Sequence, residues 1–137
     1  MSGPSPHFTW AELGNPPESV RPAMVMLAVH VLEPMRAKLG PIRITSGYRS
    51  PEKNAAIGGA KRSQHMLGEA VDLALVKGHS APAVLRAIHD LGLPVDQAIG
   101  YIPSEGGHVH VSYREVGGRG QYLWCDGPKA YKTWSPT

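Results

Sequence analysis

The chain has 137 residues, 42% of them hydrophobic, with 16 glycines, 13 prolines and a formal net charge of +3. This length and composition predict one globular α+β domain over residues 1–137 and exclude a disordered or fibrous chain. The basic residues are scattered and their excess is small, so charge alone does not select an anionic partner. No apolar run of about eighteen residues is present, so we expect no membrane insertion.

The single cysteine, Cys125, excludes an internal disulfide and a cysteine-rich zinc site, and we interpret it as a small buried hydrophobic residue. The opening MSGPSPHFTW has no basic region followed by an apolar run. This predicts synthesis in the cytoplasm without a signal peptide.

The first part of the chain carries start and stop signals for helices. Thr9 and Glu12 form a capping box, so a short helix is predicted to begin at Trp10. Apolar residues at helical spacing predict a long helix over 21–39, kinked at Pro34 and ended by Gly40.

A strand and a short helix are predicted next. Ile42 and Ile44 alternate with polar residues, which predicts a strand over 41–45 with one buried face. Ser50, followed by proline and glutamate, is typical of a helix start, and the glycine pair at 58–59 is expected to end this helix.

The second part is predicted to contain three strands and one helix. Ser80 caps a helix whose apolar stripe is Val84, Ile88 and Leu91. The predicted strands are 70–76, 97–102 and 108–113, the last two joined as a hairpin. The tail over 117–137 is rich in glycine and aromatic residues and gives no clear pattern.

The segment SQHMLGEAVDL carries the first chemical signal. On the second predicted strand, Asp72 shares a face with Ala70 and Ala74. A buried carboxylate between small residues is costly unless a metal or a cation meets it. A turn at Gly68 could fold His65 back over this carboxylate.

The segment HVHVS carries the second signal, because His108 and His110 share one strand face while the valines face the core. His65, Asp72 and one of these histidines would give two nitrogens and one carboxylate, which leaves a fourth zinc position open for water. The remaining histidine would be the general base. The sequence therefore predicts one zinc ion per chain at a hydrolytic site.

SGYRSPEKN, the glycine pair at 58–59, SQHMLGEAVDL and HVHVS, in this order and spacing over about residues 8–113, resemble the zinc D-Ala-D-Ala carboxypeptidase and peptidoglycan endopeptidase family. FTWAEL and MRAKLG are similar to its compact bacteriophage members. The resemblance implies a hedgehog-like fold, in which helices flank a small antiparallel sheet that carries the zinc site. It also implies hydrolysis of peptidoglycan stem peptides containing D-amino acids, through a metal-bound water, by a carboxypeptidase or an endopeptidase such as an endolysin.

The resemblance implies that His65, Asp72 and His110 are the zinc ligands. His108 then matches the general base, although an aromatic residue is usual at this position in many compact relatives. A second alignment stays open, because Glu105 and His108 also read as the Glu-x-x-His of some relatives, with the glutamate as base and the histidine as ligand.

Two further residues match substrate-binding positions of the family. Arg49 matches an arginine that holds the substrate carbonyl or stabilises the tetrahedral intermediate. Ser63 matches a serine that hydrogen-bonds the substrate. The alternative interpretation is structural, with Arg49 stabilising a turn and Ser63 capping a loop.

The complete set of candidate ligands, base and arginine favours a zinc peptidase over a catalytically inactive cell-wall-binding or virion structural module. Nucleic-acid binding is not expected, because no basic stripe with interleaved aromatic residues is present. We expect a monomer that reaches the cell wall after phage-mediated release, or a virion-associated enzyme.

Overall fold

The structure is a computed structural model that describes residues 3–75, 78–102, 107–127 and 129–136. Within these residues the chain forms helices and a six-stranded sheet of order β1-β2-β4-β3-β5-β6, which confirms the predicted α+β class. The elements are α1 (Arg21–Leu27), η1 (Ala28–Leu32), α2 (Glu33–Leu39), β1 (Ile44–Ser46), α3 (Pro51–Ala56), η2 (Gln64–Leu67), β2 (Ala70–Ala74), α4 (Ala81–Asp90), β3 (Gln97–Tyr101), β4 (His108–Ser112), β5 (Gln121–Cys125) and β6 (Tyr131–Thr133).

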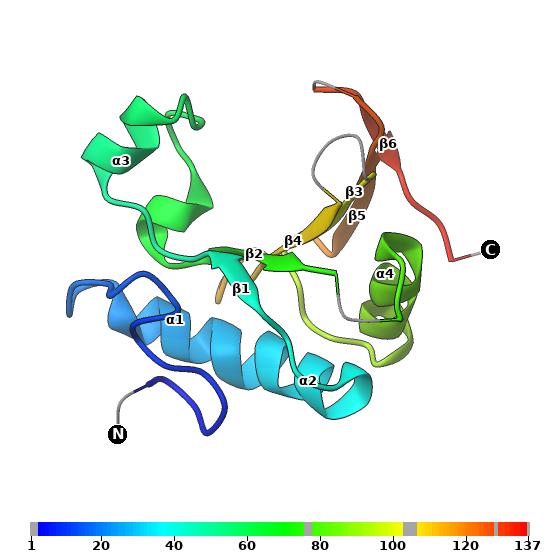
Figure 1. The fold of residues 1–137 in the computed structure, drawn as a ribbon, viewed down its shortest axis with the longest axis horizontal. Helices are drawn as coiled ribbons and strands as arrows, with labels where there is room; N and C mark the ends of the chain where they lie inside the picture. The colour runs from blue at the N-terminus through cyan, green and yellow to red at the C-terminus, as the bar shows by residue number, and fades with distance from the viewer. Residues whose placement is uncertain (1–2, 76–77, 103–106, 128, 137) are drawn as a thin grey trace.

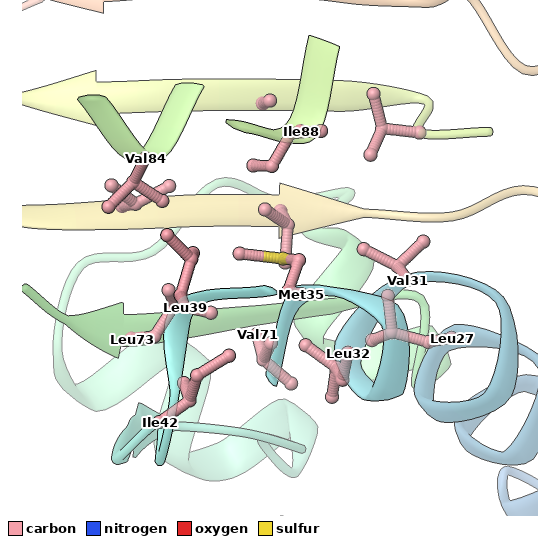
Figure 2. Close-up of a cluster of buried hydrophobic side chains, with 14 of the residues drawn as sticks. Leu27, Val31, Leu32, Met35, Leu39, Ile42, Val71, Leu73, Val84 and Ile88 are labelled. Carbon is pink, nitrogen blue, oxygen red and sulfur yellow. The ribbon is translucent and has the colours of Figure 1, made fainter. Parts of the chain in front are cut away.

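The hydrophobic core lies between the sheet and the helices α1, α2 and α4. Figure 1 shows α1 and α2 on one side of β1 and β2, with α3 on the other side. Leu32 and Met35 from the long helix meet Ile88 of α4 and the inward side chains Val71 and Leu73 of β2 (Figure 2). These side chains are fully buried. One sheet face is therefore filled with apolar residues, which leaves the opposite face of β2 and β4 for polar side chains.

The long helix is present as predicted, but it contains a π-helical turn, η1, between α1 and α2. There the N–H of Glu33 bonds to the carbonyl of Ala28, five residues earlier. Pro34 follows directly; it has no N–H, and its ring would clash with a carbonyl four residues earlier in a regular helix. The wider turn before Pro34 accommodates that proline without ending the helix.

The prediction of a helix beginning at Trp10 is wrong, because residues 10–14 form turns. The capping box itself is present: the N–H of Thr9 donates to the Glu12 carboxylate at 2.7 Å, and the N–H of Glu12 donates to Thr9 Oγ1 at 3.1 Å. The carbonyl of Leu13 then accepts from the N–H of Tyr48 at 2.7 Å instead of continuing a helix.

Smaller differences concern the ends of elements. The first strand covers Ile44–Ser46 rather than 41–45, because these are the residues that pair with β2. Leu91 was predicted in the apolar stripe of α4, but it follows the last helical residue and is 42% exposed, while Leu85 is fully buried. The predicted hairpin of β3 and β4 is confirmed. Residue 76, the predicted end of the second strand, lies outside the described residues.

The tail forms two strands that the sequence did not predict. β5 runs parallel to β3, whereas the other strand pairs that the structure describes are antiparallel. The ring of Trp124 on β5 lies against Gly100 of β3, where an added Cβ would come within 2.7 Å of it. Cys125 is buried and free, as expected. Among the described residues, no helix combines the length and apolar character needed to cross a bilayer.

Candidate metal centre

Two adjacent strands present the polar side chains of the site. β2 and β4 are antiparallel, with Asp72 directly opposite His110 and Ala74 opposite His108. The valines of β4 are fully buried in the core. Because side chains alternate along a strand, both histidines of β4 lie on the face away from α1, α2 and α4, together with Asp72.

The loop before β2 brings a third polar side chain to the same face. Ser63 caps the short helix η2, and its Oγ accepts a hydrogen bond from the N–H of His65 at 3.2 Å. Gly68 ends η2 in the left-handed conformation, with φ of 72°. This turn reverses the chain into β2, so that His65 lies over Asp72.

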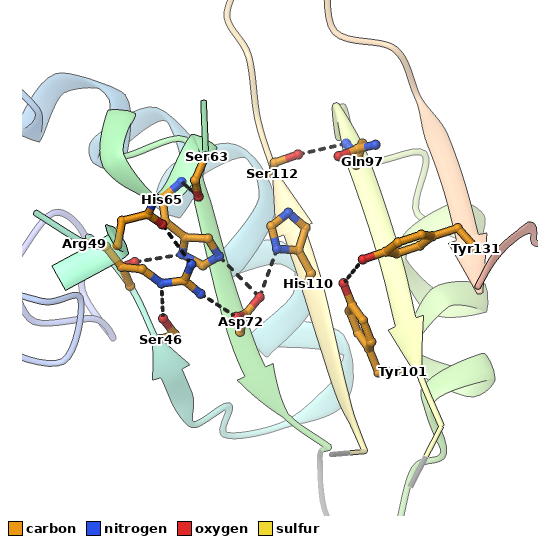
Figure 3. A network of polar contacts seen from close by, with 12 residues as sticks. Ser46, Arg49, Ser63, His65, Asp72, Gln97, Tyr101, His110, Ser112 and Tyr131 are labelled. Carbon is orange, nitrogen blue, oxygen red and sulfur yellow. Dashed lines mark hydrogen bonds and ion pairs between the residues drawn. The ribbon is translucent and has the colours of Figure 1, made fainter. Parts of the chain in front are cut away.

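His65, Asp72 and His110 converge on one point, and their nearest donor atoms all lie within 4.8 Å of one another (Figure 3). Asp72 Oδ1 is 2.9 Å from His110 Nδ1 and 3.5 Å from His65 Nε2. In a tetrahedral zinc site, ligand bonds of ~2.0–2.1 Å place the donor atoms about 3.3 Å apart. The two distances to Asp72 are therefore near those of a zinc site, and the three side chains could hold one ion.

The hydrogen bonds behind the ligand atoms orient them. His65 Nδ1 lies 2.8 Å from the carbonyl oxygen of Gly47. Because a carbonyl only accepts, Nδ1 carries the proton and the lone pair of Nε2 faces Asp72. His110 Nδ1 faces the carboxylate, so it would have to lose any proton it holds when a metal binds.

Asp72 is the anionic centre of the site. Burial would raise the pKa of Asp72, but the hydrogen bond with His110 and the close contact with His65 outweigh burial and hold that pKa well below its ordinary value. The guanidinium of Arg49 lies 3.4 Å from the other carboxylate oxygen and also donates to Ser46 Oγ at 3.2 Å. The carboxylate is therefore ionised and oriented, as a metal ligand must be.

His108 lies on the same face but not in the converging set. Its ring stacks on Tyr101, with 4.2 Å between the centroids. The Tyr101 hydroxyl in turn lies 3.1 Å from the Tyr131 hydroxyl, as Figure 3 shows. Burial lowers the pKa of His108, which the charge of Asp72 partly offsets. A neutral imidazole beside the site is suited to accept a proton. Glu105, the alternative base, lies outside the described residues.

Asp96 supports the loop that carries His65, and the sequence did not predict this role. Its side chain is fully buried and accepts two hydrogen bonds from the guanidinium of Arg119, at 2.9 and 2.7 Å. These bonds lower the pKa of Asp96. The carboxylate also accepts from Gln64, the residue before His65, at 3.0 Å. A lone aspartate in the apolar stretch LGLPVDQAIG was the available signal.

Replacing Gly68 with alanine is expected to lower the free energy of unfolding by about 2 kcal/mol and to weaken zinc binding, because the left-handed conformation alone costs about 1–2 kcal/mol. An added Cβ would also lie 2.3 Å from Val20 Cγ1 and 3.0 Å from its carbonyl oxygen. Gly92→Ala is the matched control, since Gly92 has φ of +64° and open space around it. Equal losses in both variants, measured by urea unfolding, would contradict the packing argument.

A six-stranded sheet that presents two imidazoles and one carboxylate at one point has the donor set of a zinc site with an open position. Residues 6–112 match the model of the peptidase M15 family. The chain is 31% identical over 127 residues to a zinc D-Ala-D-Ala carboxypeptidase of Streptomyces albus G, covering 85% of this chain and 48% of that protein. The chain therefore belongs to the peptidase M15 family, and it spans about half the length of this curated relative.

Proposed function

We propose that this protein is a zinc-dependent peptidase that hydrolyses peptidoglycan stem peptides containing D-amino acids. The observation that carries the proposal is the convergence of His65, Asp72 and His110 on one point. The Streptomyces relative is a zinc D-Ala-D-Ala carboxypeptidase, which supports the choice of substrate.

In this proposal His65 Nε2, Asp72 and His110 Nδ1 hold one zinc ion. Zinc bound there would act as a Lewis acid, polarising the scissile carbonyl and lowering the pKa of a bound water molecule. The hydrogen bond from His65 Nδ1 to the carbonyl of Gly47 keeps the ligand nitrogen directed at the site. His108 accepts the proton that the attacking water loses and later returns it to the leaving amine.

Arg49 and Ser63 have positioning and binding roles in the proposal. Arg49 donates to Asp72, Ser46 and Asn54, and the remaining N–H on each of its terminal nitrogens can stabilise the negative charge that develops on the carbonyl oxygen. The Ser63 oxygen accepts from the N–H of His65, so its hydroxyl proton is free to donate to a substrate carbonyl. Both residues therefore combine the structural and functional roles that the sequence left as alternatives.

Incubation of the purified protein with muropeptides tests the proposal. We expect shortened stem peptides in the presence of zinc and a loss of product when a chelator removes the metal, because the three ligands act only through the ion. Mass spectrometry of the products gives the bond that is cut. Product formation that persists at full rate after complete removal of metal would contradict the zinc mechanism.

We further propose a monomeric enzyme of the phage lysis type, which reaches the wall when a partner opens the membrane. The similarity of FTWAEL and MRAKLG to compact phage members supports this role. Expression in a susceptible bacterium, with and without a membrane-opening protein, tests it: lysis is expected only with the partner. Size-exclusion chromatography with light scattering checks the oligomeric state.

A further inference from the structure

A cleft lies beside the candidate metal centre on the polar face of the sheet. It has a volume of about 330 Å³. Its lining combines one ligand, the candidate base, small residues and one cation, namely Asp72, His108, Ala74, Gly107, Thr45 and Arg43. Arg43 and Thr45 lie outside the cluster of candidate metal ligands.

The strand register explains why Arg43 reaches this cleft. Its carbonyl accepts a hydrogen bond from the N–H of Ala74 at 3.0 Å, and Ala74 is paired with His108. Arg43, Ala74 and His108 thus form a row across three neighbouring chain segments. Asp72 and His110 form the next row, about 6.5–7 Å away along the strands. Ile42 is buried, so alternation directs Arg43 to the polar face.

The two arginines near the site, Arg43 and Arg49, differ in the partners of their guanidinium groups. The guanidinium of Arg49 contacts Ser46, Asn54 and Asp72. Among the residues that the structure describes, no hydrogen bond or ion pair engages the guanidinium of Arg43. Within the described part of the chain, the cleft therefore holds a cation that no acidic side chain pairs, one row away from the metal ligands.

We propose that Arg43, assisted by the Thr45 hydroxyl, binds the free α-carboxylate of the residue that leaves on hydrolysis. This inference rests on the proposed function, because it requires the scissile carbonyl to lie at the metal ligands. The carboxylate of a C-terminal residue lies about one residue length, ~3.8 Å, beyond that carbonyl, and so falls between the ligand row and Arg43. The small side chain of Ala74 leaves room for it.

A carboxylate bound at Arg43 favours one class of substrate, peptides with a free C-terminus just beyond the scissile bond. A guanidinium binds a carboxylate through two parallel hydrogen bonds but gains no such pair with a neutral amide. A peptide that ends one residue after the scissile bond is then preferred over a peptide that continues. The protein would act as a carboxypeptidase that removes a terminal D-amino acid.

The first test compares hydrolysis of an acylated D-Ala-D-Ala peptide with that of its C-terminal carboxamide, using the zinc-loaded full chain. We expect Arg43→Ala to lower kcat/KM for the free acid ~10- to 100-fold, as for loss of a charge-assisted hydrogen-bonded pair. The value for the carboxamide should change less than about twofold, since no charge is bound there. Lys38→Ala is the matched control, because it removes a cation from α2, on the helical face of the sheet.

The second test needs no turnover. A peptide whose scissile amide is replaced by CH₂–NH is titrated calorimetrically into the zinc-loaded protein, as free acid and as carboxamide. Wild type should bind the acid ~10-fold or more tightly than the amide, Arg43→Ala should bind both alike, and Arg43→Lys should retain part of the preference. Equal affinities of wild type for both ligands, or an undiminished preference in Arg43→Ala, would overturn the inference. Absence of hydrolysis of either peptide would count against the proposed function instead.

Discussion

Replacing Asp72 with alanine is expected to abolish zinc binding and hydrolysis together. Loss of a residue that only supports a ligand typically weakens metal binding ~10- to 100-fold, so loss of this ligand should exceed ~100-fold. Asp72 is also the group that both imidazoles contact, at 2.9 and 3.5 Å. Elemental analysis after dialysis against a defined zinc concentration measures the effect, and stem-peptide hydrolysis is followed in parallel.

The two histidines of β4 supply the matched controls for this experiment. We expect His110→Ala to lose zinc as Asp72→Ala does. His108→Ala should keep zinc but lower turnover, by ~10²- to 10⁴-fold if it is the general base. The reverse outcome, with zinc lost from His108→Ala and kept by His110→Ala, would favour the alternative in which Glu105 is the base. Zinc-dependent hydrolysis by Asp72→Ala would refute the proposed centre.

Replacing Asp96 with alanine is expected to lower the free energy of unfolding by about 3 kcal/mol, because buried donors lose a charged acceptor. The bonds at stake come from Gln64 and from the side chain and backbone of Arg119. Because Gln64 precedes His65, zinc affinity should also fall, by ~10-fold as for other supporting groups. Urea unfolding and zinc titration measure the two effects.

Asp126→Ala is the control for Asp96→Ala, because Asp126 pairs with Lys132 at the surface, where Lys132 is 66% exposed. Such a surface pair contributes about 0–1 kcal/mol to the free energy of unfolding. A loss near 3 kcal/mol in Asp126→Ala would therefore contradict the claim that burial makes Asp96 important.

The pH dependence of stability gives an independent check on Asp96. The native pKa of Asp96 is lowered from an unfolded value of about 3.9, so its stabilisation is present above that pH and is lost as pH falls below it. The stability difference between wild type and Asp96→Asn should therefore shrink on acidification.

Short sequence patterns predicted much of this fold, because helix caps and strand alternation depend on residues that are close together in the chain. Ser50 and Ser80 cap their helices with side-chain hydrogen bonds, as the residue types indicated. The alternation in HVHVS predicted which side chains of β4 face the core, since the period of a strand is set by the backbone. The predicted metal ligands lie close together because β2 and β4 are paired, and that pairing itself was not predicted.

What the sequence did not predict depends on contacts between distant segments. The capping box at Thr9 indicated a helix, but the chain forms only turns there, and the carbonyl of Leu13 accepts a hydrogen bond from the N–H of Tyr48 instead. The strand β5 pairs in parallel with β3. Parallel strands are not joined by a tight turn, so no turn residues in the sequence indicate this pairing. The role of Asp96 likewise follows from Arg119, which is distant in the sequence.

The pairing of β5 with β3 has a practical consequence for dissecting this protein. The family match ends at residue 112, before β5 and β6 begin. A fragment cut there would leave β3 with one edge of unsatisfied backbone groups and would uncover Gly100 where Trp124 now covers it. Exposed strand edges recruit other chains, so such a minimal fragment should self-associate. Residues 6–112 alone are thus a poor substitute for the whole chain.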